Sequence, residues 1–117
     1  MRVVAIAAAA IIVLSAWPAT AEPRWLGCKF SVRAGPEQTF QMVFDDLRNT
    51  AYLFDAGLLV EGAGTSITYQ ALRTRFPSFS LTYNRNDGGL AVTPPTGGIM
   101  SGECRRIAQP QGAPNPP

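Results

Sequence analysis

Hydrophobic and polar residues alternate in several short stretches between Arg24 and Ile107. In the first stretch Cys28, Phe30 and Val32 fall on one face, and polar residues fall between them on the other. Because successive side chains of a β-strand point to opposite faces, this pattern predicts a strand with one buried side. We expect most of this region to form strands of the same kind.

Similar patterns predict further strands in the second half of the chain. The strands expected there cover residues 67–72, 79–83, 90–93 and 99–107. A turn-forming segment, Asn84–Gly89, separates two of them with the sequence NRNDGG. Asn, Asp and Gly favour tight turns because they accept backbone conformations that most residues avoid. The pattern therefore predicts antiparallel hairpins.

The segment from residue 36 to residue 56 fits two patterns. Its hydrophobic residues follow helical spacing, yet every second residue from Phe40 to Phe44 is also hydrophobic, as in a strand. We favour a hairpin that turns at residues 45–49, because a helix ending at Asp55 would place a negative charge against its own dipole. One helix in this segment is the alternative.

About seven short antiparallel strands in a region of this length indicate an all-β fold, either a small barrel or a sandwich. The alternative is an α+β fold with one helix near residues 36–56. A chain of 117 residues is long enough for one domain but not for two. We place that domain at residues 22–107.

The N-terminal segment has the organisation of a secretory signal peptide. Arg2 provides a positive charge, an apolar run from Val3 to Leu14 follows, and the segment Ala19–Ala21 provides the small residues of a cleavage site. The run is shorter than the roughly 20 residues that span a bilayer. We therefore expect a signal peptide at residues 1–21, the general secretion route, and a periplasmic or extracellular protein without a transmembrane segment.

The two cysteines of the chain are Cys28 and Cys104, near opposite ends of the expected domain. An exported chain with two cysteines favours one intramolecular disulfide. The cross-link would join the first and last strands and stabilise the fold by about 4.5 kcal/mol. The segment Leu26–Cys28 resembles a bacterial lipobox only superficially, because the leucine stands at the wrong distance from the cysteine. Lipid attachment is therefore not expected.

The end of the chain differs from the rest in composition. Residues 108–117 are rich in proline and show no hydrophobic periodicity. We expect an extended or disordered tail here, because such a sequence has few hydrophobic side chains to bury.

Histidine is absent from the chain, which excludes catalytic triads and metal sites that depend on it. A disulfide would also occupy both cysteines, and no phosphate-binding or dinucleotide-binding motif is present. Asp45, Asp46 and Asp55 are the remaining candidates for acid–base chemistry or cation binding, although adjacent aspartates are common in turns. We therefore predict a non-enzymatic protein without catalytic residues, metal or cofactor.

The formal net charge of +2 does not indicate a nucleic-acid-binding protein, because no concentrated basic segment accompanies it. The balance of charge is nevertheless uneven, because residues 62–117 hold five basic and only two acidic residues. The five basic residues are Arg73, Arg75, Arg85, Arg105 and Arg106. Arg73, Arg75 and Arg85, together with Tyr69, are the candidate residues of a surface for an anionic partner. The alternative interpretation is a set of solvated side chains on the outer faces of strands.

The sequence thus predicts a small exported binding module whose partner is an unknown protein or a component of the cell envelope. The surfaces considered are a sheet face and the loops around residues 61–66 and 84–89. A carrier for a small apolar ligand inside a barrel is one alternative. Such a carrier would line its cavity with residues such as Phe40, Phe44, Leu81 and Val92.

A proteinaceous inhibitor of a hydrolase such as lysozyme is the other alternative. The outline of the chain, with an export signal, an early cysteine, short strands and a late cysteine, is similar to that of the small periplasmic inhibitors of c-type lysozyme. Those inhibitors carry a Ser-Gly-x-x-Tyr-like loop, whose spacing the segment Gly62–Tyr69 does not reproduce. The similarity is one of architecture and assigns no family.

Overall fold

The computed structural model describes residues 22–31 and 35–117. The predicted signal peptide at residues 1–21 lies outside the described residues. Nine β-strands form in the described part of the chain, which contains no helix. No segment within these ranges is a helix with the length and hydrophobicity needed to cross a bilayer.

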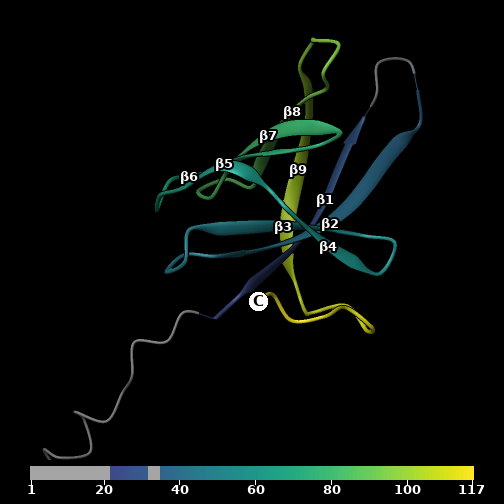
Figure 1. Ribbon diagram of the computed structural model, residues 1–117. Coiled ribbons are helices and arrows are strands. Elements are labelled where there is room, and N and C mark those ends of the chain that lie inside the picture. The colour runs from purple at the N-terminus through teal and green to yellow at the C-terminus, as the bar shows by residue number, and fades with distance from the viewer. Residues whose placement is uncertain (1–21, 32–34) are drawn as a thin grey trace, which may run out of the picture.

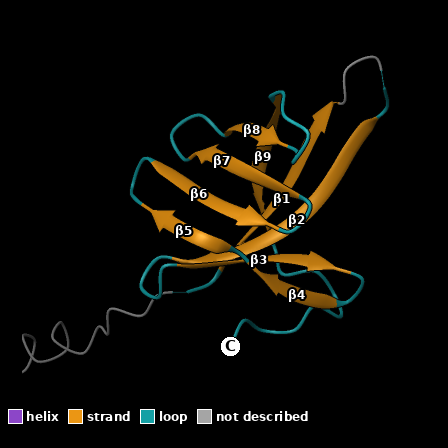
Figure 2. Ribbon diagram, turned by 45° about the horizontal axis from the view of Figure 1, so that its top comes forward, coloured by secondary structure: helices purple, strands orange, loops and turns teal. Residues whose placement is uncertain are grey.

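The nine strands follow one another along the chain with short connections (Figure 1). They are β1 (Arg24–Ser31), β2 (Glu37–Asp45), β3 (Thr50–Asp55), β4 (Leu58–Glu61), β5 (Ala63–Ile67), β6 (Ala71–Phe76), β7 (Phe79–Asn84), β8 (Gly89–Thr93) and β9 (Met100–Ile107). Every pair of neighbours is antiparallel, and the order in the sheet is β4-β3-β2-β1-β9-β8-β7-β6-β5. The sheet wraps into a nearly closed barrel (Figure 2).

The two ends of the sheet belong to one nearly continuous stretch of chain. β4 pairs with β3, whereas β5 pairs with β6, and only Gly62 separates β4 from β5. The amide of Gly62 donates to the backbone oxygen of Ala51 in β3 at 2.8 Å. A Cβ at position 62 would clash with the hydroxyl of Thr74 in β6. The chain therefore passes from one edge of the sheet to the other at a position where only glycine fits.

The side chain of Asn49 completes the closure beside Gly62. Its Nδ2 donates to the backbone oxygen of Thr65 at 2.9 Å, and its Oδ1 accepts from the amide of Ile67 at 3.0 Å. Asn49 has a φ of 54°, a left-handed conformation that asparagine tolerates better than most residues. The side-chain amide of Asn49 thus provides one donor and one acceptor to the backbone of β5, as the backbone of a paired strand would.

The inner faces of the strands form one hydrophobic core. Its buried members are Leu26, Cys28, Phe30, Met42, Phe44, Ala51, Leu72, Phe76, Leu81, Tyr83, Leu90, Val92 and Cys104. Phe44, Leu81 and Val92, which a carrier would place around its cavity, are part of this cluster, and Phe40 packs against it.

A second, smaller cluster lies on the outer face of the first three strands. Trp25, Val43 and Tyr52 are buried there, and Ala113 from the proline-rich tail packs against them. The guanidinium of Arg48 also donates to the backbone oxygen of Pro117 at 2.6 Å. Residues 108–117 contain no strand and no helix, and these contacts attach them to the outer wall of the barrel.

The predicted disulfide between Cys28 and Cys104 is confirmed. The two residues are direct partners in the pairing of β1 with β9, and their Cα atoms lie 4.0 Å apart. Because β1 and β9 come from opposite ends of the described chain, the bond closes a loop with a sequence separation of 76.

The all-β fold is confirmed, and residues 36–56 form the predicted hairpin of β2 and β3 rather than a helix. The strand count is nine instead of about seven. The strand predicted at residues 67–72 is wrong, because residues 68–70 turn the chain between β5 and β6. The hydroxyl of Thr68 accepts from the amides of Gln70 and Ala71 at 3.3 and 3.1 Å, which stabilises this turn. Two strands, β5 and β6, lie on either side of that turn in place of the one predicted, and β4 was not predicted.

Replacing Asn49 tests the closure of the barrel. We expect Asn49→Gly to lower the free energy of unfolding by about 1–2 kcal/mol, because it removes two hydrogen bonds but permits the positive φ. Asn86→Gly is the matched control, since no hydrogen bond is formed by the Asn86 side chain among the described residues. Urea denaturation of both variants measures the difference. Equal losses would contradict the role of Asn49.

Removing the disulfide tests the pairing of β1 with β9. We expect the double variant Cys28→Ala and Cys104→Ala to lose about 2–5 kcal/mol of stability, because the unfolded chain is then no longer cross-linked. Thermal or urea denaturation measures the loss. The reduced wild-type protein should show a similar loss, and a double variant as stable as the oxidised wild type would contradict the expectation.

Candidate functional site

Arg73 and Arg75 lie on the outer face of β6. They alternate with Leu72, Thr74 and Phe76, whose side chains are buried on the inner face. The strand geometry therefore directs both guanidinium groups to the outside of the barrel. Residues two apart on a strand lie about 7 Å apart, so the two cationic groups stand close together on one wall.

The strands on either side of β6 present short side chains next to these arginines. The direct neighbours are Ser66 and Thr82 beside Arg73, and Ala63 and Ser80 beside Arg75. Beyond them, β8 contributes Ala91 and Thr93. The short side chains leave a hollow of about 370 Å³ that both arginines line.

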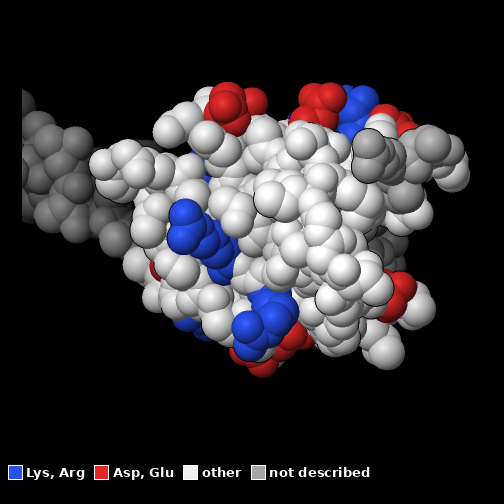
Figure 3. Space-filling model, turned by 90° about the horizontal axis from the view of Figure 1, so that it is seen from above, with Lys and Arg blue, Asp and Glu red and all other residues white. Residues whose placement is uncertain are grey.

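Neither Arg73 nor Arg75 forms an ion pair in the described part of the chain, whose ion pairs involve other residues. Figure 3 shows basic side chains on a face that is otherwise mostly uncharged, with acidic side chains toward its edges. Unpaired guanidinium groups of this kind can form bidentate hydrogen bonds with carboxylate, sulfate or phosphate groups.

Arg85 occupies a different environment at one end of the barrel. Its Nη1 and Nη2 donate to the two carboxylate oxygens of Asp46 at 2.7 and 3.2 Å, and Nη1 also donates to the backbone oxygen of Thr68 at 2.8 Å. The guanidinium carbon lies 5.1 Å from the ring centre of Phe44. Only 15% of the Arg85 side chain is exposed, so these contacts account for most of its surface.

Tyr69 lies near Arg85 rather than near the outer-face arginines. It occupies the turn between β5 and β6, and 81% of its surface is exposed. Tyr69 and Arg85 line one hollow, Arg73 and Arg75 line another, and no residue lines both. The structure therefore divides the four residues of the predicted surface into two pairs.

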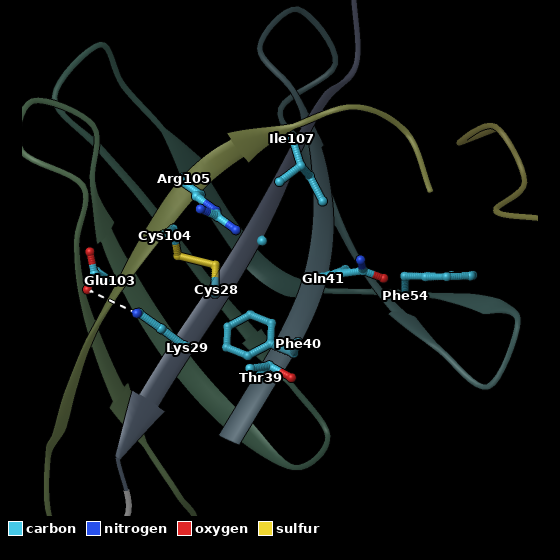
Figure 4. A pocket seen from close by; sticks show the side chains of 11 residues that line it. Cys28, Lys29, Thr39, Phe40, Gln41, Phe54, Glu103, Cys104, Arg105 and Ile107 are labelled. Atoms are coloured by element: carbon cyan, nitrogen blue, oxygen red, sulfur yellow. Dashed lines mark ion pairs between the residues drawn. A yellow bond between two sulfur atoms is a disulfide. The ribbon is translucent and has the colours of Figure 1, made fainter. Parts of the chain in front are cut away.

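A third hollow lies on the outer face of β1, β2 and β9, around Gly27 (Figure 4). Gly27 has Gln41 and Arg105 as its cross-strand neighbours, and the missing side chain leaves a hollow of about 500 Å³. The Arg105 side chain lines this hollow, whereas Lys29 pairs with Glu103 at 3.7 Å (Figure 4). A glycine inside a predicted strand was the sequence signal for this hollow, because such glycines often mark close approach to the backbone.

The three aspartates considered for acid–base chemistry or cation binding do not form one cluster. Asp45 and Asp46 have partners within the fold, and Asp55 lies apart from them. Asp45 accepts from the amides of Leu47 and Arg48 at 3.0 and 3.2 Å, which fixes the turn after β2. Asp46 pairs with Arg85, and Asp55 lies at the far end of β3. Among residues 22–31 and 35–117, no three His, Cys, Asp or Glu side chains are placed to hold a metal ion.

Comparisons with protein-family models, with characterised proteins and with solved structures found no significant match to this chain. The arrangement of its own residues is therefore the basis for a functional proposal.

Proposed function

We propose that this protein is an exported, non-catalytic binding module that recognises an anionic component of the cell envelope through the outer face of β5–β8. The observation that carries this proposal is the position of Arg73 and Arg75. Both stand unpaired, within the described structure, over a hollow lined by short side chains. An anionic group would gain charge-assisted hydrogen bonds there without displacing an existing ion pair.

The shape of this surface favours an extended partner. The two guanidinium groups are about 7 Å apart along β6, and the rest of the surface is an open wall. The hydroxyl groups of Ser66 and Thr82 flank Arg73 and can hydrogen-bond to a bound chain. We infer that the partner is an anionic polysaccharide, whose successive charged groups can contact both arginines.

Export to an oxidising compartment is part of the proposal. The Cys28–Cys104 disulfide is consistent with such a compartment, because disulfides persist mainly in exported proteins. The signal-peptide pattern of residues 1–21 supports the same location, periplasmic or extracellular.

Inhibition of a hydrolase such as lysozyme is the second candidate function, and the turn at residues 68–70 supports it. The exposed Tyr69 stands on this turn, which the Thr68 hydroxyl holds through hydrogen bonds to two backbone amides. A rigid turn that presents one aromatic side chain is suited to entering a partner's cleft.

Replacing the two outer-face arginines tests the proposed function. We expect the double variant Arg73→Ser and Arg75→Ser to bind dextran sulfate about tenfold more weakly than wild type, because it loses two charge-assisted contacts. The affinity of the variant should also depend less on salt concentration. Titration calorimetry over a series of salt concentrations measures both effects, with neutral dextran as the uncharged comparison.

The double variant Lys29→Ser and Arg105→Ser is the matched control. It removes the same amount of charge from the hollow around Gly27 and should keep most of the affinity for dextran sulfate. An equal loss of affinity in both double variants would show that β5–β8 is not the binding surface. Binding of neutral dextran as tight as that of dextran sulfate would contradict recognition of an anionic partner by this surface.

Replacing Tyr69 tests the second candidate function. If the turn enters a hydrolase cleft, the wild-type protein inhibits c-type lysozyme and Tyr69→Ala weakens the inhibition by about tenfold or more. Leu47→Ala is a suitable control, because Leu47 is another exposed hydrophobic residue, 71% accessible, in a different turn. Lysozyme activity assays with both variants measure the effect, and full activity in the presence of wild-type protein excludes this candidate for c-type lysozyme.

A further inference from the structure

Charged side chains gather where the inner faces of the strands reach one end of the barrel. Each stands two residues beyond a buried core residue of its strand: Arg24 before Leu26, Asp46 after Phe44, Arg85 after Tyr83, and Arg106 after Cys104. The strand pairing brings them to the same end, because Arg24 is the partner of Phe44 and Arg106 is the partner of Leu26. We call this group the barrel mouth.

Asp46 is the one carboxylate of the barrel mouth, and it is shared by two arginines. Both of its oxygens accept from Arg85, and Oδ2 also lies 3.6 Å from Nε of Arg24. The contacts of Arg85 with Thr68 and Phe44 hold its guanidinium in place. Arg85 is thus positioned before any ligand arrives, and its charge is balanced by Asp46.

Arg106 adds a third cationic group without a carboxylate partner in the part of the chain that the structure describes. It is exposed, and together with Arg24 and Arg85 it lines a hollow of about 200 Å³. Three guanidinium groups against the one carboxylate of Asp46 leave two positive charges in excess. The barrel mouth therefore has a net positive charge.

The same hollow is also lined by one aliphatic and three aromatic residues, of which all but Tyr69 are buried core residues. Leu26, Phe44 and Tyr83 provide its inner side, and the exposed ring of Tyr69 stands at its edge. A ligand that fits this surface has an anionic group for the arginines and a small apolar or aromatic body for the rings. The volume suits a small molecule or a single headgroup rather than a polymer.

We propose that the barrel mouth is a second binding site, distinct from the outer face of β5–β8, and that it takes a phosphate group. A phosphate monoester carries a charge of about −1.5 to −2 at neutral pH, which matches the two excess positive charges. Its three terminal oxygens can accept from several guanidinium groups at once. Free phosphate, a small phosphate monoester and a lipid phosphate headgroup share this chemistry.

Adjacent arginines on β9 provide a sharp test of this proposal. Arg106 faces the barrel mouth, whereas Arg105 faces the outer hollow around Gly27. We expect Arg106→Gln to weaken the binding of phenyl phosphate by about tenfold or more, and Arg105→Gln to change it by less than about twofold. Titration calorimetry of the oxidised protein with phenyl phosphate and with inorganic phosphate measures both effects.

The source of the phosphate group is distinguished by three probes. Tighter binding of phenyl phosphate than of inorganic phosphate indicates a monoester with an apolar body, and equal affinity indicates free phosphate. Sedimentation with phosphatidic acid vesicles that requires Arg106 indicates a lipid headgroup. Each of these results supports the site, whereas no binding of any probe at millimolar concentration overturns it.

Two further controls separate this site from the proposed function and from effects on folding. The Arg73→Ser and Arg75→Ser double variant should bind phenyl phosphate like wild type, even if it no longer binds dextran sulfate. Arg106→Gln should unfold at the same temperature as wild type, because Arg106 is exposed and forms no ion pair among the described residues. Equal weakening by Arg105→Gln and Arg106→Gln would show that general positive charge, rather than the mouth, attracts phosphate.

Discussion

The pairing of β1 with β9 is the constraint on which the rest of the barrel depends. These strands lie in the centre of the sheet order and join the strands β2–β4 to the strands β5–β8. The Cys28–Cys104 bond fixes their register, since the two cysteines are direct partners. A slip of one residue would turn every side chain of β9 to the opposite face. The same register therefore determines that Arg106 reaches the barrel mouth and that Arg105 remains outside.

The opposite seam of the barrel, between β4 and β5, has no disulfide. Gly62 allows the chain to pass close to Thr74, and the side chain of Asn49 supplies the hydrogen bonds that a paired strand would otherwise make. Each device depends on the properties of one residue type, glycine for its lack of a side chain and asparagine for its amide and its tolerance of positive φ. The β1–β9 pairing is thus cross-linked by a disulfide, whereas the β4–β5 edge is closed by the close approach at Gly62 and by the side-chain hydrogen bonds of Asn49.

Alternation along the chain predicted most of the strands because most of them bury their inner face in one main core. The β2–β3 hairpin was predicted from alternation together with the unfavourable charge of Asp55 at a helix end, and the disulfide was predicted from the two cysteines of an exported chain. Alternation failed at residues 67–72, where hydrophobic and polar residues alternate as in a strand. The hydroxyl of Thr68 accepts hydrogen bonds from two nearby amides there, and the chain turns. β4 was missed because three of its four residues are hydrophobic in succession, so that no alternation marks it.

The candidate residues illustrate why composition alone could not place the binding surfaces. Arg73 and Arg85 look equivalent in the sequence, but Arg73 alternates with core residues on β6 whereas Arg85 follows Tyr83 on the inner side. The partner of Arg85, Asp46, is far away in the sequence and becomes its neighbour only when β2 and β7 reach the same end of the barrel.

The position of the charged residues in the barrel mouth, in contrast, follows from the alternation of inner and outer side chains along each strand. A charged residue two positions beyond the last buried residue of an inner face must lie where the core meets solvent. When several strands of a barrel end in this way, the sum of these charges determines which ion the opening attracts. Here that sum is positive because one carboxylate, Asp46, faces three arginines. The outer wall and the opening are therefore both cationic but differ in shape, which suits the wall to an extended anion and the opening to a small one.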